Sequence, residues 1–119
     1  MSALDRDRHF NNLLTEMDGL LSQAPEPEAG LQAVCELLHR RVAHYDWVGF
    51  YWTHPAQAAT CSLETKAEIV LPIFRAEQLI GELDIDSHTP APFTNADESF
   101  LSAVIERVLP LAPQSASGG

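Results

Sequence analysis

The hydrophobic pattern of this 119-residue chain predicts an α+β fold in which helices pack on a small, mainly antiparallel sheet. Two segments near the N-terminus and one near the C-terminus repeat apolar residues at helical spacing. Between them lie three short segments rich in aromatic and β-branched residues, which is typical of strands. A chain of this length forms one core. We therefore expect a single domain over residues 1–112 and a flexible tail at 113–119.

Two amphipathic helices are predicted before the first strand. Apolar residues recur three and four positions apart in the first of them, which we place at residues 4–23. Two prolines at residues 24–27 end this helix. A second apolar stripe starts at Leu31 and predicts a helix that ends near His44. Cys35 lies within this stripe, where we expect a small buried side chain.

Three strands are predicted in the second half of the chain. Residues 46–52 are aromatic and favour a strand, whereas residues 53–65 show no period and are expected to form a loop. Residues 68–75 and 79–86 are two further strands, and the short connection between them predicts an antiparallel hairpin.

The last of these strands divides into an apolar and an acidic face. Side chains alternate between the two faces of a strand. One face is expected to carry Leu79, Gly81, Leu83 and Ile85. The other is expected to carry Ile80, Glu82, Asp84 and Asp86. The second face is therefore unusually acidic.

A third helix is predicted near the C-terminus. Thr94 and Asn95 are suitable caps, and apolar residues at helical spacing follow them. Asp97 and Glu98 fall in the first turn, where negative charge suits the helix dipole. We expect the first and last helices to lie side by side.

The charge of the chain argues against nucleic-acid and membrane partners. Seventeen acidic residues against seven Lys and Arg give a net charge of −10, which repels phosphate backbones and anionic lipid surfaces. The N-terminus has no apolar leader, and no apolar run is long enough to span a bilayer. We expect a cytoplasmic protein whose two cysteines form no disulfide framework.

The segment from Cys61 to Asp86, together with the aromatic residues Trp47 and Tyr51, is the candidate site. Carboxylates such as Asp84 and Asp86 suit the ammonium of a free amino acid, and the aromatics suit an apolar side chain. Alternative interpretations are that the aromatics are ordinary core or surface residues and that the acidic residues form a solvated strand face.

A metal site is the third interpretation of the same residues. Glu68, Asp84 and Asp86 are oxygen ligands of the kind that calcium or magnesium prefers. The five histidines show no zinc-ligand spacing. We assign no metal and no cofactor from the sequence.

The strings DWVGFYW, EIVLPIF, LIGELDIDS and FTNADESFL resemble those of GAF domains, specifically the free methionine-(R)-sulfoxide reductases. The resemblance implies that Cys61, seven residues before Glu68, is the nucleophile. The implied substrate-binding residues are Trp47, Tyr51, Glu68, Asp84 and Asp86.

The chemistry of sulfoxide reduction by a thiol indicates a mechanism for this assignment. Glu68 or Asp86 would protonate the sulfoxide oxygen, and Cys61 would end as a sulfenic acid that a second thiol resolves. Thioredoxin or another thiol reductant is the expected partner. Carboxylates disfavour a nearby thiolate, and Arg75 or Lys66 is a candidate counter-charge.

The chain departs from this family in its middle. There, a longer segment supplies further strands and a resolving cysteine, whereas only residues 52–60 occupy that position here. A second function therefore stays open, namely a non-catalytic GAF module that binds a small ligand or mediates dimerisation. The shortened sheet exposes an edge, which favours a homodimer.

Overall fold

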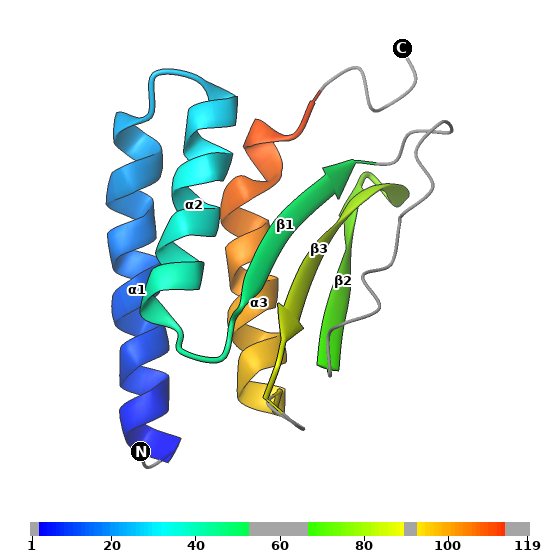
Figure 1. The fold of residues 1–119 in the computed structure, drawn as a ribbon. Helices are drawn as coiled ribbons and strands as arrows, with labels where there is room; N and C mark the ends of the chain where they lie inside the picture. Colours follow the sequence, from blue (N-terminus) through cyan, green and yellow to red (C-terminus); the bar gives the residue numbers. More distant parts are fainter. Residues whose placement is uncertain (1–2, 53–66, 90–92, 114–119) are drawn as a thin grey trace.

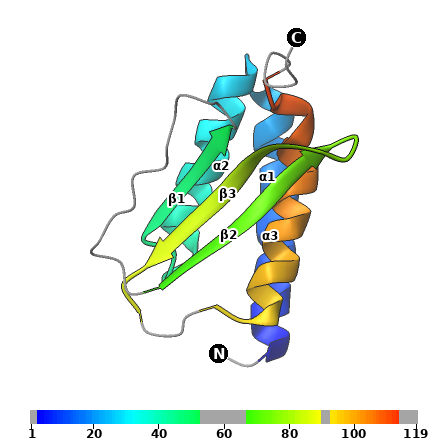
Figure 2. The ribbon, with the colours of Figure 1, turned by 90° about the vertical axis from the view of Figure 1, so that its right-hand side faces the viewer.

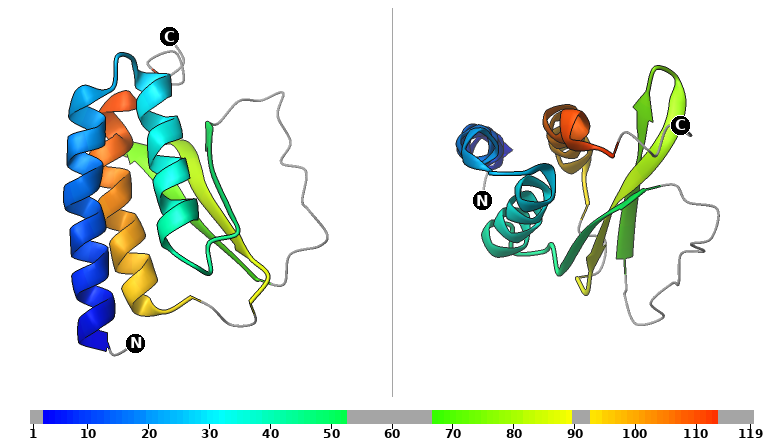
Figure 3. Two further views of the ribbon diagram at one scale, coloured as in Figure 1. Left: turned by 60° about the vertical axis from the view of Figure 1, so that its left-hand side comes forward. Right: turned by 90° about the horizontal axis from the view of Figure 1, so that it is seen from above.

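The computed structural model describes residues 3–52, 67–89 and 93–113, and the chain forms three layers (Figures 1 and 3). One layer is a sheet of three antiparallel strands in the order β1-β3-β2. Its strands are β1 (Trp47–Trp52), β2 (Ala67–Arg75) and β3 (Gln78–Ser87). The helices are α1 (Ala3–Gln23), α2 (Pro27–Arg41) and α3 (Asn95–Val108), with a short 3₁₀ turn at Leu109–Leu111. The predicted fold class is confirmed.

All three helices lie on one side of the sheet, which we call the inner side (Figure 3). Helices α2 and α3 contact the sheet, and α1 packs on both of them from the far side. The rings of Phe10 and Phe100 stack with centroids 4.1 Å apart, which joins α1 to α3. The Arg107 Nε donates to Asp18 Oδ1 at 2.9 Å across the same contact. The first and last helices therefore lie side by side, as predicted.

Helix α2 ends three residues before the predicted position near His44. Its last residue is Arg41, and Val42 is already extended with φ of −114°. The next residues turn toward α3, because the side chains of His44 and Tyr45 both reach Asp97. No helix in the described part of the chain is long and apolar enough to cross a membrane.

The β2–β3 hairpin contains a β-bulge that corrects the predicted face of two residues. Ile73 pairs with Gly81, but Phe74 pairs with Leu79, which leaves Ile80 without a partner. The bulge turns Ile80 into the core, where it is fully buried, and leaves Leu79 47% exposed. The alternation predicted for Leu79 and Ile80 is therefore wrong, whereas it holds from Gly81 onward.

The two faces of the sheet differ in composition. On the inner face, Val48, Leu71, Leu83 and Ile85 join the main hydrophobic core together with helix residues. Figure 2 looks onto the opposite, outer face, which none of the helices in the described ranges covers. This outer face carries the candidate site.

Candidate functional site

Strand pairing gathers the described members of the predicted site on the outer face. Paired residues of antiparallel strands share a face. Asp86 on the central strand pairs with Trp47 on one side and with Glu68 on the other. Two residues along, Asp84 pairs with Gly49 and with Val70. Tyr51 and Glu82 form the next pair on the same face.

Glu68, Asp84 and Asp86 form what we call the acidic cluster. Each contributes an oxygen, and these oxygens all lie within 4.8 Å of one another. Their burial increases from Glu68, which is exposed, through Asp84 to Asp86, which is only 8% exposed. Three carboxyl groups are thus held together by the strand register.

The acidic cluster has few compensating contacts. The Oδ1 atoms of Asp84 and Asp86 are buried without a hydrogen-bond partner among the described residues. Burial, contact with Glu68 and the charge of Asp86 raise the pKa of Asp84 to about 8. Burial and the charge of Glu68 also raise the pKa of Asp86, while a hydrogen bond with Asp84 and the charge of His88 oppose this shift. At neutral pH the cluster therefore holds a proton or attracts a cation.

Two aromatic side chains lie beside the cluster on β1. The Trp47 Nε1–H donates a hydrogen bond to the Tyr51 hydroxyl at 3.1 Å. Both rings remain accessible, with 52% of Trp47 and 40% of Tyr51 exposed. Gly49 lies between them, and a Cβ there would stand 3.0 Å from Tyr51 Cε2 and 3.2 Å from Trp47 Nε1. The absence of a side chain at residue 49 lets the two aromatics meet.

Comparisons with known proteins agree with this architecture. No protein-family model matches the chain. GAF domain-containing protein A of Dictyostelium discoideum is 25% identical over 150 aligned positions, covering 89% of this chain and 94% of that protein. A structure described as a GAF sensor protein from Burkholderia vietnamiensis has a TM-score of 0.78 at 20% identity, covering 94% of this chain and 92% of that one. The chain has a GAF-like fold.

A second solved structure with this GAF-like fold is an enzyme. Free methionine-R-sulfoxide reductase from Neisseria meningitidis, in complex with its substrate, has a TM-score of 0.74 at 22% identity. The match covers 97% of this chain and 96% of that one. Identities of 20–22% show a common fold and not a common activity. The alignment with the Dictyostelium relative has 150 positions, more than the 119 residues here, so that relative contains segments without a counterpart in this GAF-like chain.

The structure describes one of the two cysteines. Cys61, the expected nucleophile, lies outside the described residues. Cys35 packs against the core from α2, but it is only partly buried, whereas a buried side chain was predicted. Burial and the neighbouring Glu36 raise the pKa of the Cys35 thiol to about 11, against an opposing hydrogen bond with the backbone of Phe50. Cys35 thus lies on the inner side of the sheet and stays a thiol at neutral pH.

Arg75 does not serve as a counter-charge for the acidic cluster, contrary to one suggestion from the sequence. It stands at the end of β2, while Glu68 stands near the beginning of the same strand. Its guanidinium donates to the carbonyl oxygens of Leu109, Ala112 and Pro113, at 3.2–3.3 Å. Arg75 therefore caps the chain after α3. Lys66, the other candidate, lies outside the described residues.

Sequence reasoning placed Asp97 in the first turn of α3 and missed its wider role. Its Oδ1 accepts the Tyr45 hydroxyl at 2.7 Å and lies 2.9 Å from His44 Nε2. Its Oδ2 accepts the backbone N–H and the hydroxyl of Thr94, both at 2.9 Å. Burial alone would raise the pKa of Asp97, but these hydrogen bonds lower it to about 2. The spacing of Thr94 and Asp97 is that of a capping box and was the available signal.

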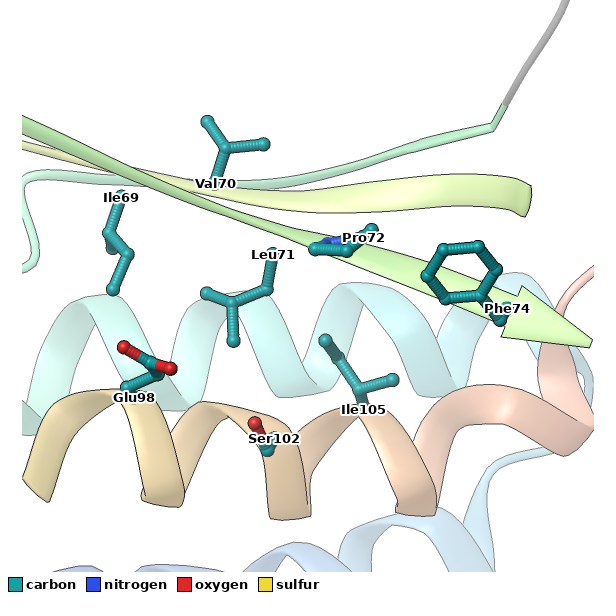
Figure 4. A pocket seen from close by; sticks show the side chains of 8 residues that line it. All are labelled: Ile69, Val70, Leu71, Pro72, Phe74, Glu98, Ser102 and Ile105. Atoms are coloured by element: carbon teal, nitrogen blue, oxygen red, sulfur yellow. The ribbon is translucent and has the colours of Figure 1, made fainter. Parts of the chain in front are cut away.

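A groove of about 390 Å³ lies away from these residues, between the free edge of β2 and α3 (Figure 4). Ile69 and Leu71 point from β2 toward α3, whereas Val70 points to the outer side (Figure 4). Apart from Glu98 and Ser102, the described residues that line it are apolar. The acidic cluster and the aromatic pair therefore define the candidate site.

Proposed function

We propose that this protein binds free methionine (R)-sulfoxide on the outer face of its sheet and reduces it to methionine with the Cys61 thiol. The observation that carries the proposal is the shared face of two accessible aromatic rings and the acidic cluster. One strand pair, Trp47 with Asp86, joins the two groups directly. A substrate with a cationic head and a short apolar chain matches this arrangement.

Recognition follows from the charges. The substrate ammonium takes the place of the missing hydrogen-bond donors at Asp84 and Asp86. Its methyl and methylene groups lie against Trp47 and Tyr51, because aromatic rings favour contacts with the sulfur-containing side chain of methionine. Glu68 completes the negative end of the site.

The chemistry uses one thiol of the protein and external thiols. Cys61 Sγ attacks the sulfoxide sulfur while a carboxyl group, Glu68 or Asp86, protonates the oxygen. The oxygen passes to Cys61, which releases methionine and leaves a sulfenic acid. An external thiol then forms a mixed disulfide with Cys61 and releases water, and a second thiol restores the cysteine.

The reductant is an external one, such as thioredoxin. Cys35 is the other cysteine of the chain, and it lies on the inner side of the sheet with a raised pKa. A thiolate is the attacking species in disulfide exchange, so a thiol with this pKa is a poor resolving group.

The test is turnover of the two sulfoxide epimers with dithiothreitol, with methionine quantified by chromatography. We expect methionine from the R epimer with wild type and none with Cys61→Ser. Asp84→Asn should lose at least tenfold in kcat/KM, whereas Glu82→Gln, an equal charge change on the same strand and face, should stay close to wild type. No turnover in wild type, together with no sulfenic or mixed-disulfide mass on Cys61, would exclude the reductase.

A non-catalytic GAF module is the second candidate. It is favoured by the absence of a resolving thiol on the site's face within the described residues and by the likeness to a GAF domain-containing protein. This module would bind an amino acid without turnover or would mediate dimerisation. Isothermal titration calorimetry with methionine sulfoxide tests for binding. Light scattering of the purified protein tests for dimerisation.

A further inference from the structure

The acidic cluster has the dimensions of a divalent-cation site. Its three oxygens come from neighbouring strands rather than from a loop, and all lie within 4.8 Å of one another. Opposite ligands of a calcium ion stand roughly 5 Å apart, and those of the smaller magnesium ion about 4 Å apart. The upper limit of 4.8 Å on the separations in the cluster is compatible with a calcium ion.

A second observation comes from Asp86. More than nine-tenths of this residue is buried, and its Oδ1 has no hydrogen-bond partner among the described residues. Burying a carboxylate without a partner is costly. The Oδ1 atom of the neighbouring Asp84 is also buried without a hydrogen-bond partner among the described residues. Two unpartnered buried oxygens within one cluster are a second, independent indication of a cation-binding site.

The charge balance favours a divalent ion over an ammonium alone. Among the described arginines, Arg41 pairs with Glu16, Arg107 pairs with Asp18, and Arg75 binds carbonyl oxygens. None of these three forms an ion pair with the cluster. One ammonium offsets one unit of the negative charge that the three carboxyl groups can carry, whereas a divalent cation offsets two.

We propose that Glu68, Asp84 and Asp86 bind a hard divalent cation of the calcium class. The ligand set is entirely carboxylate oxygen, which favours calcium-like ions over zinc or copper. Water completes the coordination on the exposed side of Glu68. This binding does not depend on sulfoxide chemistry, and a free amino acid competes with the ion for the same carboxylates.

Terbium(III), a calcium analogue, tests the proposal by luminescence sensitised from tryptophan in the full chain. Trp47 is suited as the sensitiser because it is the strand partner of Asp86. We expect luminescence that calcium displaces, and at least a tenfold weaker signal in Asp84→Asn and Asp86→Asn. Glu82→Gln and Cys61→Ser should keep the wild-type signal. Cation binding is therefore measured independently of sulfoxide reduction, and failure of one proposal is distinguishable from failure of the other.

Calcium should also raise the melting temperature of wild type and of Glu82→Gln, because a ligand that binds only the folded state stabilises it. Asp84→Asn should show no such rise. Circular dichroism checks the fold of each variant, and calorimetric titration of wild type with calcium stands independently of any variant. Equal terbium signals in wild type and Asp84→Asn, or no displacement by calcium, would overturn the proposal.

Discussion

Asp97 at the start of α3 and Asp86 on the outer face of β3 are both more than nine-tenths buried, but their surroundings differ. Asp97 accepts hydrogen bonds from Tyr45 and Thr94 and lies beside His44, and its pKa falls to about 2. Asp86 stands among other carboxylates with an unpartnered oxygen, and its pKa is raised. The fold thus supplies hydrogen-bond donors to the carboxylate of Asp97 and leaves one oxygen of Asp86 without a donor.

The same difference separates the two faces of the sheet. The inner face is filled by side chains from the helices, and its stability depends on packing. The outer face exposes Trp47 and Tyr51 beside unsatisfied acids. Groups that lower the stability of the unliganded protein are typical of a ligand-binding surface. Substitutions matched across the two faces test this distinction.

The largest effect is expected at the β-bulge. Ile80→Ala removes a fully buried side chain and should lower the free energy of unfolding by about 2–5 kcal/mol, because a cavity remains. Leu79→Ala, one residue earlier on the outer side, should change it by roughly 0.5 kcal/mol or less. Urea unfolding measures both. A larger loss from Leu79→Ala than from Ile80→Ala would restore the simple alternation.

The bulge also marks the limit of what this sequence predicts. The three helices, the three strands and the acidic face followed from periodicity, because each element has enough residues to show its repeat. A single unpaired residue such as Ile80 leaves no periodic signal. It arises from pairing between Phe74 and Leu79, a contact that local patterns do not contain.

The candidate site divides in the same way. Alternation predicted the acidic face of β3, and family resemblance assigned Trp47 and the acidic cluster to one site. The register of the strands places these residues on one face. The Asp97 network was missed because His44 and Tyr45 are more than fifty residues away in sequence. The role of Arg75 was also missed, since it depends on where the chain after α3 comes back to β2.

The second-largest effect is expected at Asp97, whose carboxylate has its hydrogen-bond donors within the fold. Asp97→Ala leaves the donors of Tyr45 and Thr94 without an acceptor and removes the capping box of α3. The free energy of unfolding should fall by about 2–3 kcal/mol in urea titrations at pH 7. Glu98→Ala, the next residue of the same helix and an exposed one, is the matched control and should cost less than about 0.5 kcal/mol. Equal losses would show that Asp97 acts only through helix propensity.

The third effect compares two glycines on opposite faces. At Gly81, a Cβ would stand 2.5 Å from the backbone oxygen of Tyr51 and 2.6 Å from the Trp52 ring, so Gly81→Ala should cost about 1–3 kcal/mol. At Gly49, the nearest atoms belong to exposed side chains that can move. Gly49→Ala should therefore leave stability within about 1 kcal/mol of wild type.

Gly49→Ala should still weaken ligand binding, because it separates the Trp47 indole from the Tyr51 hydroxyl. We expect roughly tenfold weaker binding of methionine sulfoxide by calorimetry, a loss of about 1.4 kcal/mol. Unchanged affinity in a variant with an intact fold would show that the aromatic pair takes no part in recognition.

The smallest effect is a dependence on pH with opposite signs for the two kinds of carboxylate. Asp97 has a folded pKa of about 2, below the roughly 3.9 of an unfolded chain. Its contribution to stability is present above about pH 4 and is lost as the pH falls toward 2. Asp84 has a folded pKa of about 8, so the folded state binds more protons than the unfolded state between about pH 4 and 8. Its charge therefore lowers stability as the pH rises through that range.

Asp84→Asn removes the second of these effects, the loss of stability between about pH 4 and 8. The variant should be more stable than wild type at pH 8.5 by roughly 1 kcal/mol, a value typical of like charges on neighbouring strands, and the difference should vanish near pH 4. Urea unfolding with a chelator present measures this without bound cations. A variant less stable than wild type at pH 8.5 would mean that Asp84 has a hydrogen-bond donor in solution. The acidic cluster would then be a completed site like that of Asp97, and neither an ammonium nor a metal ion would be needed to explain it.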